Sequence, residues 1–312
     1  MEYSDISLTI LTAKECGIFK SNAQFWKEFS DRRLLESLPN NPIFYEKREH
    51  LAYVLDSSDS DSGIVSVFDD KFPVINRRVK NNSEKPYLLF YKGNLSLLED
   101  LNKNVAVIGL VDPTGDIEKR GSKIVEALVD NDLVIVSGLA RGCDTIAHKA
   151  CLAASGKTIA VLPNPINQVF PVENTALADR IVENSGLLIS EYYTAPKSKN
   201  DAVGRFIERD RLQAMFAKAI VLLASYRKGE GDSGSRHAME AAAKYGIDRY
   251  VMYNPAIDEN NERFGLNRDL LLSRDKASII TSKLIVDISM LTNHNISLDQ
   301  EQFYQQQAFE CF

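Results

Sequence analysis

The feature that most constrains the fold is a regular alternation of short apolar runs and helical stripes from residue 104 onward. The runs are apolar at nearly every position and rich in β-branched residues, as in strands that are buried on both faces of a parallel sheet. Between them, apolar residues recur at helical spacing, for example at Ile117, Val125 and Leu128. This alternation predicts a doubly wound α/β sheet. The runs are VAVIG (105–109), LVIVS (133–137), TIAVLP (158–163), LLISEY (187–192), AIVLLA (219–224) and YVMYN (250–254).

The first hundred residues follow a different pattern. Helical stretches on either side of Pro39 and Pro42 are followed by a Ser/Asp run at 56–63. The 29 residues after Lys283 end in a glutamine-rich stretch, which is compatible with a docked helix or with a frayed end. The predicted division is a small helical domain over 1–72, the sheet domain over 73–283 and a short C-terminal tail over 284–312.

Composition places the chain among ordinary globular proteins. Hydrophobic residues make up 44% of the 312 residues and charged residues 26%. We expect no membrane span and no secretion signal, because no run of eighteen apolar residues and no basic N-terminal region followed by an apolar core is present. The cysteines form no C-x-x-C pair, which favours a reducing cytoplasm over a zinc site or a disulfide framework. They are Cys16, Cys143, Cys151 and Cys311.

Glycine-bearing turns follow two of the predicted strands. SGLARG (137–142) comes directly after the second run, and SYRKGEGDSGS (225–235) follows the fifth run and leads into a helix. Glycine lets a backbone approach a ligand closely, and the N–H groups of a helix N-terminus favour an anion. Taken alone, the second turn is more typical of a flexible loop with a serine N-cap. Because both turns are expected at one edge of the sheet, together they predict a phosphate site.

Charge is unevenly distributed. The net charge of −6 argues against a nucleic-acid partner, but the segment 197–228 carries eight basic and three acidic residues. Within it, Arg209 and Arg211 would face one side of an extended segment and different sides of a helix. Paired guanidinium groups suit bidentate phosphate contacts, while ion pairing with Glu208 and Asp210 is the alternative.

No catalytic or cofactor motif stands out. The turns lack the G-x-x-x-x-G-K-[ST] phosphate loop, and Gly109, Gly115 and Gly121 are too far apart for a dinucleotide fingerprint. The sequence also shows no Ser–His–Asp set, no paired carboxylates for acid–base chemistry and no metal-ligand cluster. His148 follows Asp144 by four residues and is expected to be a packed histidine rather than a catalytic one.

The order of the motifs along the chain is informative. It reads VAVIG, SGLARGCDTIAHKA, GKTIAVLP, VFPVEN, GLLISEY, F-x-x-R-x-R, SGS and GLNRDLL. Over residues 68–282 this set resembles the DprA/Smf family of DNA-processing proteins. The resemblance implies an extended Rossmann-like fold, single-stranded DNA binding, a homodimer and the loading of a RecA-type recombinase in DNA recombination. It implies no catalysed reaction, no cofactor and no metal.

The resemblance also suggests which residues contact DNA. Backbone amides and guanidinium groups would hold successive phosphates without reading bases, which gives sequence-tolerant and salt-sensitive binding. Carried over by position, the expected nucleic-acid-binding residues are Gly109, Ser137, Gly138, Arg141, Gly142, Asn174, Arg209, Arg211, Ser233, Gly234 and Ser235.

Three features depart from the family pattern. Leu110 and Val111 stand where the family has Ser-Arg, so a phosphate-contacting arginine is lost. Asp210 stands where the family has asparagine and adds a negative charge to the expected groove. The C-terminal tail is too short for the winged-helix domain of many members. A divergent member is expected, which works beside a dedicated protein partner in phage defence or in control of a toxin.

Two other functions compete with DNA binding. Phosphoribohydrolases resembling the LOG proteins share the broad superfamily, but Ala238 occupies the position of their glutamate, and Glu240 would point to another side of the helix. A sensor of a small phosphorylated ligand, or a scaffold for a partner, is the other alternative. The acidic net charge favours it, whereas Arg209, Arg211 and the SGS turn favour DNA.

Overall fold

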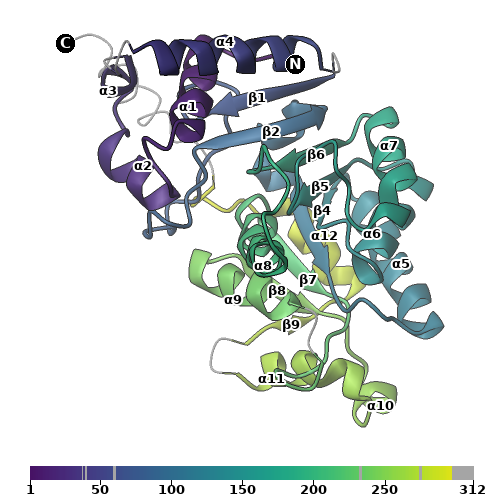
Figure 1. Cartoon of the computed structure of the whole chain (residues 1–312). Coiled ribbons are helices and arrows are strands. Elements are labelled where there is room, and N and C mark those ends of the chain that lie inside the picture. Colours follow the sequence, from purple (N-terminus) through teal and green to yellow (C-terminus); the bar gives the residue numbers. More distant parts are fainter. Residues whose placement is uncertain (37, 39–40, 59–60, 232–233, 274–275, 297–312) are drawn as a thin grey trace.

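The computed structural model describes residues 1–36, 38, 41–58, 61–231, 234–273 and 276–296. In these residues a nine-stranded sheet has the order β1-β2-β6-β5-β4-β3-β7-β8-β9 (Figure 1). Strand β2 is antiparallel to both of its neighbours, and every pairing from β6 to β9 is parallel. The strands are β1 (Ser62–Ser66), β2 (Leu88–Gly93), β3 (Asn104–Ile108), β4 (Val134–Ser137), β5 (Thr158–Leu162), β6 (Leu187–Ser190), β7 (Ala219–Leu222), β8 (Asp248–Val251) and β9 (Ser278–Ile279).

The predicted doubly wound sheet is confirmed. Each predicted apolar run forms a strand, and helices cover both faces of the sheet. Leu212 of α8 and Ala242 of α9 pack on one face, while Val125 of α5 and Ala147 of α6 pack on the other. The helices are α1 (Asp5–Glu15), α2 (Asn22–Glu28), α3 (Arg32–Glu36), α4 (Pro42–Asp56), α5 (Gly115–Val129), α6 (Cys143–Ala153), α7 (Thr175–Glu183), α8 (Lys199–Met215), α9 (Ser235–Tyr245), α10 (Pro255–Asp258), α11 (Gly265–Leu272) and α12 (Ser282–Met290).

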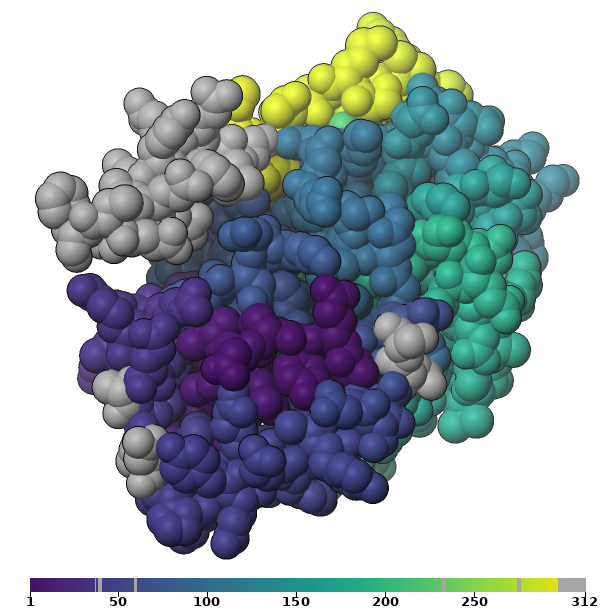
Figure 2. Space-filling view, turned by 90° about the horizontal axis from the view of Figure 1, so that it is seen from above, coloured from purple at the N-terminus to yellow at the C-terminus, as the bar shows by residue number. Residues whose placement is uncertain are grey.

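The N-terminal helices pack on β1 and β2 at the edge of the sheet. Alternate residues of β2 face opposite sides, so that Phe90 joins the N-terminal core while Leu89 joins the core under α8 and α9. The rings of Phe25 and Tyr87 stack with their centroids 4.1 Å apart at the centre of the N-terminal core. In the view from above, the N-terminal region (purple) lies directly against the rest of the molecule (Figure 2).

Some details differ from the sequence-based expectations. Strand β1 lies inside the range 1–72, which was predicted to be helical, and it pairs with β2 in the common sheet. It was missed because its SGIVS sequence has a single pair of apolar residues next to the Ser/Asp run. Helix α12 crosses the predicted start of the tail at residue 284. The exact domain boundaries stay predictions, and most of the tail lies outside the described residues.

Candidate nucleic-acid interface

Apart from Arg209 and Arg211, which lie on α8 after β6, the predicted site residues lie at the ends of β3, β4, β5 and β7 or in the segments that follow them, at the carboxyl edge of the parallel strands. The order of the strands reverses between β3 and β7, and such a switch point creates a crevice outside the sheet. The turn after β4 and the start of α9 meet near this point, because α8 brings Arg209 and Asp210 between them. The expectation that these separate segments gather at one edge is therefore met.

The turn after β4 is organised by a carboxylate of the chain itself. Oδ2 of Asp144 accepts hydrogen bonds from the backbone N–H groups of Gly138 at 3.1 Å and Ala140 at 3.4 Å. The Ser137 hydroxyl is fully buried and donates to the carbonyl of Val107 at 2.7 Å. The amides that were expected to face a phosphate therefore already bind an anionic group.

The glycines of this turn make room for protein groups. A Cβ atom on Gly138 would overlap Nη1 of Arg209, so the guanidinium lies directly against the backbone of the turn. Gly142 has a φ of +72°, and a Cβ atom there would collide with the carbonyl oxygen of Leu110. The groups that come close to these glycines are therefore Arg209 and the segment after β3.

The segment after β3 closes the N-terminus of α6. A Cβ atom on Gly109 would lie 2.6 Å from Sγ of Cys143, so this glycine is needed for packing. Leu110 is fully buried, and its carbonyl accepts the N–H of Cys143 at 3.0 Å. The first N–H group of α6 is therefore bonded within the chain and not left for a phosphate.

Arg209 is the basic group at the centre of the site. It lies on α8 and is 3% exposed, with Nη1 3.8 Å from Oδ2 of Asp144 and Nε 3.5 Å from Oδ1 of Asp210. Neither nitrogen makes a hydrogen bond with the described residues. Its guanidinium also lies 5.8 Å from the centroid of the Phe206 ring. Buried donors without hydrogen-bond partners lower the stability of the folded protein. An anion that reached Arg209 would supply those partners and offset this cost.

Asp210 faces the N-terminus of α9. Its Oδ2 lies 3.3 Å from the position of a Cβ on Gly234, the N-cap residue, whose φ is +91°. Burial raises the pKa of Asp210 to about 7; the charge of Arg209 lowers it and that of Asp144 raises it. The side chain of Asp210 thus lies next to the second predicted anion site. Ser235 is buried at the first helical position, and Ser233 lies outside the described residues.

Arg211 points to a different part of the molecule. Its side chain pairs with the carboxylate of Glu191 at 2.8 Å and donates to the carbonyl of Glu84 at 2.8 Å. Glu191 also accepts a hydrogen bond from Asn22 on α2 at 3.2 Å. Both arginines lie within α8 rather than in an extended segment, so Arg209 and Arg211 face different directions. The structure does not bring the two guanidinium groups together.

Two further predicted residues support the turn after β4. Asn174 is 6% exposed and donates from Nδ2 to the carbonyl of Leu139 and to Oγ1 of Thr145, both at 2.9 Å. Arg141 is exposed and forms an ion pair with Glu173. Asn174 therefore holds the turn in place, while Arg141 is the basic side chain of this turn that solvent can reach.

His148 is packed, as predicted. Its Nδ1 lies 2.7 Å from Oγ1 of Thr158 in the core. Burial and the charge of Arg209 lower its pKa to about 3, so the imidazole is neutral at physiological pH. Asp144, which the sequence suggested as its helix neighbour, instead contacts the turn and Arg209.

An exposed aromatic edge was not singled out from the sequence. Phe170, in the loop after β5, is 51% exposed, and its ring lies 5.8 Å from that of Phe206 in an edge-to-face arrangement. Phe206 in turn contacts Arg209. The spacing of F-x-x-R on a helix was the signal that could have predicted this contact, because residues three apart share a face.

The residues relevant to hydrolysis both lie on α9. Ala238 is fully buried on α9, and Glu240 is exposed and pairs with Arg236 at 2.7 Å. Within the described ranges, no three His, Cys, Asp or Glu residues gather closely enough to hold a metal ion. Among the same residues, no helix has the length and apolar character to span a membrane.

The match to a family model decides the relationship. Residues 63–288 match the model of DNA recombination-mediator protein A. The chain belongs to this family. The DNA processing protein DprA of Streptococcus pneumoniae strain R6 is 35% identical over 196 residues, which are 62% of this chain and 64% of that protein. The Smf protein of Escherichia coli K12 is 29% identical over 180 residues, 58% of this chain and 46% of that protein.

Solved structures of DprA proteins share the fold. DprA from Streptococcus pneumoniae has a TM-score of 0.69 and 27% identity, and the match covers 94% of this chain and all of that one. DprA from Helicobacter pylori, described for its single-stranded DNA binding mode, has a TM-score of 0.59 and 26% identity over 72% of this chain and 94% of that one. The sequence relatives are matched over less than two thirds of their length, so only the family and the fold carry over directly.

Proposed function

We propose that this member of the DprA family binds single-stranded DNA by its phosphate backbone at the carboxyl edge of the sheet, between the turn after β4 and the start of α9. The observation that carries the proposal is Arg209, a buried guanidinium with two nitrogens that make no hydrogen bond within the part of the chain that the structure describes. A phosphate oxygen is the partner that such a group binds best.

Two carboxylates set the strength of this binding. Asp144 and Asp210 both lie beside Arg209, so in their ionised forms they offset the charge of the guanidinium before DNA arrives. A phosphate must compete with them for the guanidinium and for the backbone amides. Protonation of Asp210, whose pKa is about 7, removes one competing charge near neutral pH. Binding is therefore weaker than in a site with asparagine at this position, and it strengthens on mild acidification.

The aromatic edge and the exposed basic residue complete the interface. Phe170 offers a ring on which an unpaired base can stack without regard to sequence. Arg141 lies on the same turn as Gly138 and can exchange Glu173 for a phosphate, because this ion pair is solvent-exposed. Arg211 acts here as a support that fixes α8 to the N-terminal helices.

The test is fluorescence anisotropy with a labelled 20-nucleotide oligo-dT and a blunt duplex of equal length. We expect the single strand to bind more tightly and its affinity to fall steeply with salt. Arg209→Ala should weaken binding about tenfold or more, and the control Arg33→Ala, an exposed arginine on α3, should not. Equal binding by the Arg209→Ala and Arg33→Ala variants would remove the basis of the proposal.

Catalysis is not part of the proposed function. Ala238 provides no carboxylate at the position where phosphoribohydrolases need one. Incubation with nucleoside monophosphates should release no free base, and measurable release would overturn this point. The homodimer, the RecA-type recombinase or dedicated protein partner, the cytoplasmic location and a role in phage defence stay predictions from the sequence.

A further inference from the structure

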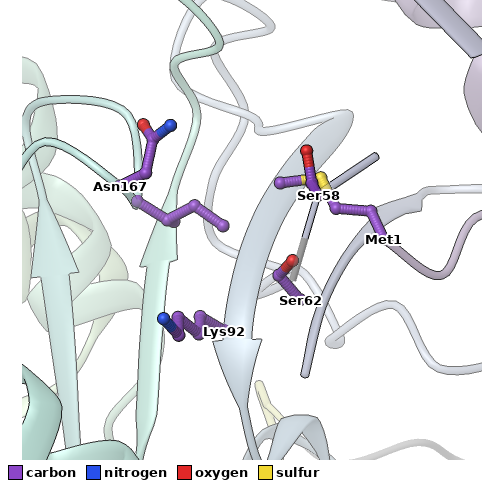
Figure 3. Close-up of a pocket in the computed structure, with 6 residues that line it drawn as sticks. Met1, Ser58, Ser62, Lys92 and Asn167 are labelled. Carbon is purple, nitrogen blue, oxygen red and sulfur yellow. The ribbon is translucent and has the colours of Figure 1, made fainter. Parts of the chain in front are cut away.

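A cleft separates the N-terminal helices from the loops that follow β5 and β6. It consists of a cavity of about 340 Å³ and an adjoining one of about 170 Å³, which share Met1, Ser58, Ile166 and Asn167. Figure 3 shows Asn167 on one side of the smaller cavity and Met1, Ser58 and Ser62 on the other. We call it the N-terminal cleft. The larger cavity is within the size range of small-molecule sites in proteins.

The N-terminal cleft opens at the same edge of the sheet as the proposed DNA site. Its floor includes Ile166 from the loop after β5 and Thr194 from the loop after β6. Gln168 lines the cleft, and Phe170, two residues further on, contacts Phe206 next to Arg209. Two residues of chain span at most about 7 Å, so the Phe170 end of this chain of contacts lies close to the cleft.

The lining of the larger cavity suits a neutral planar group. Among the described residues that line it, none has a side chain that is charged at neutral pH, and the terminal ammonium of Met1, which also lines it, donates a hydrogen bond to the carbonyl of Leu55 at 2.8 Å. Tyr192 and Tyr193 line it and are partly exposed, and the Tyr193 ring is held by stacking on Phe90 with centroids 5.7 Å apart. A phosphate would find no cationic side chain here, whereas an aromatic ring system would find a stacking surface.

Unused hydrogen-bonding groups lie at the mouth of the cleft. Asn167 and Gln168 are exposed, and within the described residues their side-chain amides make no hydrogen bond. A carboxamide offers a donor and an acceptor side by side, which matches the edge of a nucleobase. Aromatic rings beside such groups are the usual means by which proteins hold unstacked bases.

We propose that the N-terminal cleft receives one unpaired base of the bound strand, with the base against Tyr193 and its edge at Asn167 and Gln168. The proposal rests on the proposed binding of single-stranded DNA and adds a second contact, made jointly by the N-terminal helices and the sheet loops. It gives the N-terminal region a direct part in DNA binding, because Val54 and Leu55 of α4 form one wall.

The test compares a 20-nucleotide oligo-dT with an abasic oligomer of the same length, by anisotropy at fixed salt. The wild type should prefer oligo-dT by about tenfold. Tyr193→Leu and Asn167→Leu should each lower this preference, whereas Tyr193→Phe, which keeps the ring, should retain it. Tyr45→Leu, an exposed tyrosine of α4 that does not line the cleft, is the matched control. Asn167→Leu alters an exposed loop residue and keeps the test valid if Tyr193→Leu fails to fold.

A spectroscopic readout locates the base directly. An oligomer with 2-aminopurine should lose fluorescence on binding to the wild type and to Tyr193→Phe, and lose less with Tyr193→Leu. If Tyr193→Leu and Asn167→Leu keep the full preference and the full quenching, the cleft is not a base site, although the backbone site stands. If the wild type binds neither oligomer, both the proposed function and this inference fall.

Discussion

Nη1 of Arg209 lies 3.8 Å from Oδ2 of Asp144, directly under the backbone of Gly138. The same carboxylate oxygen accepts the N–H groups of Gly138 and Ala140. One buried carboxylate therefore organises both the turn and the guanidinium that lies beneath it. An anion that binds at this edge of the sheet therefore meets a guanidinium that is already in place and whose charge Asp144 partly offsets.

Asp210→Asn should increase the affinity for oligo-dT by about tenfold at pH 8, because it removes a negative charge beside Arg209. The wild type should bind more tightly as the pH falls from 8 to 6, since Asp210, with a pKa of about 7, takes up a proton in this range. The variant should lack that increase. Anisotropy titrations at several pH values check this, and parallel pH profiles for the two proteins would show that Asp210 does not control binding.

Asp210 should also affect stability. Its pKa is raised above the ordinary 3.8 to about 7, so the folded protein holds a proton that the unfolded chain releases. Its contribution to stability is therefore greatest below about pH 4 and is lost as the pH rises toward 7. Asp210→Asn should unfold at a higher urea concentration than the wild type at pH 8, and the gain should shrink at pH 5. A gain that is the same at both values would contradict the raised pKa.

Gly138→Ala should destabilise the protein by about 3 kcal/mol, because the added methyl group overlaps the Arg209 guanidinium. It should also weaken DNA binding by displacing Arg209. The matched control is Gly204→Ala in α8, where nothing lies within 4 Å of the added Cβ. That change should stabilise the protein by about 0.5–1 kcal/mol, as a mid-helix glycine replaced by alanine does. Urea unfolding of both variants measures the difference in stability. Equal effects of the two substitutions would contradict the close approach of Arg209 to Gly138.

Arg211→Ala should lower the free energy of unfolding by about 3–5 kcal/mol, because it leaves the buried carboxylate of Glu191 without its partner. The salt dependence of DNA binding, measured well below the unfolding temperature, should stay the same. The opposite outcome is that Arg211→Ala keeps its stability and loses DNA affinity. In that case Arg211 contacts phosphate directly, as the sequence predicted, and its supporting role is wrong.

His148→Gln should change how stability depends on pH. The pKa of His148 is about 3 in the folded protein against an ordinary 6.5, so on acidification the unfolded chain binds the proton first. The wild type therefore loses stability relative to the variant as the pH falls below 6.5, by about 2 kcal/mol between pH 7.5 and 5. Urea midpoints of the two proteins at these pH values measure it, and a constant difference would show that His148 titrates normally.

The sequence predicted the sheet well because buried parallel strands are continuous apolar runs, as in TIAVLP before the loop with Asn174. It did not predict β1 or the helical setting of Arg209, since short polar-rich strands and mixed charged segments carry little periodicity. The glycines were correctly placed at one edge. What they approach, however, depends on three-dimensional contacts with Arg209 and Leu110, which no local pattern encodes.

The most direct test of the central claim is hydrogen–deuterium exchange with and without oligo-dT at low salt. We expect DNA to slow exchange in the turn 137–142 and at the start of α9, and we expect the effect at both to be lost in Arg209→Ala. Slower exchange confined to other parts of the molecule, such as α10 to α12, with no change at these two segments would contradict the central claim.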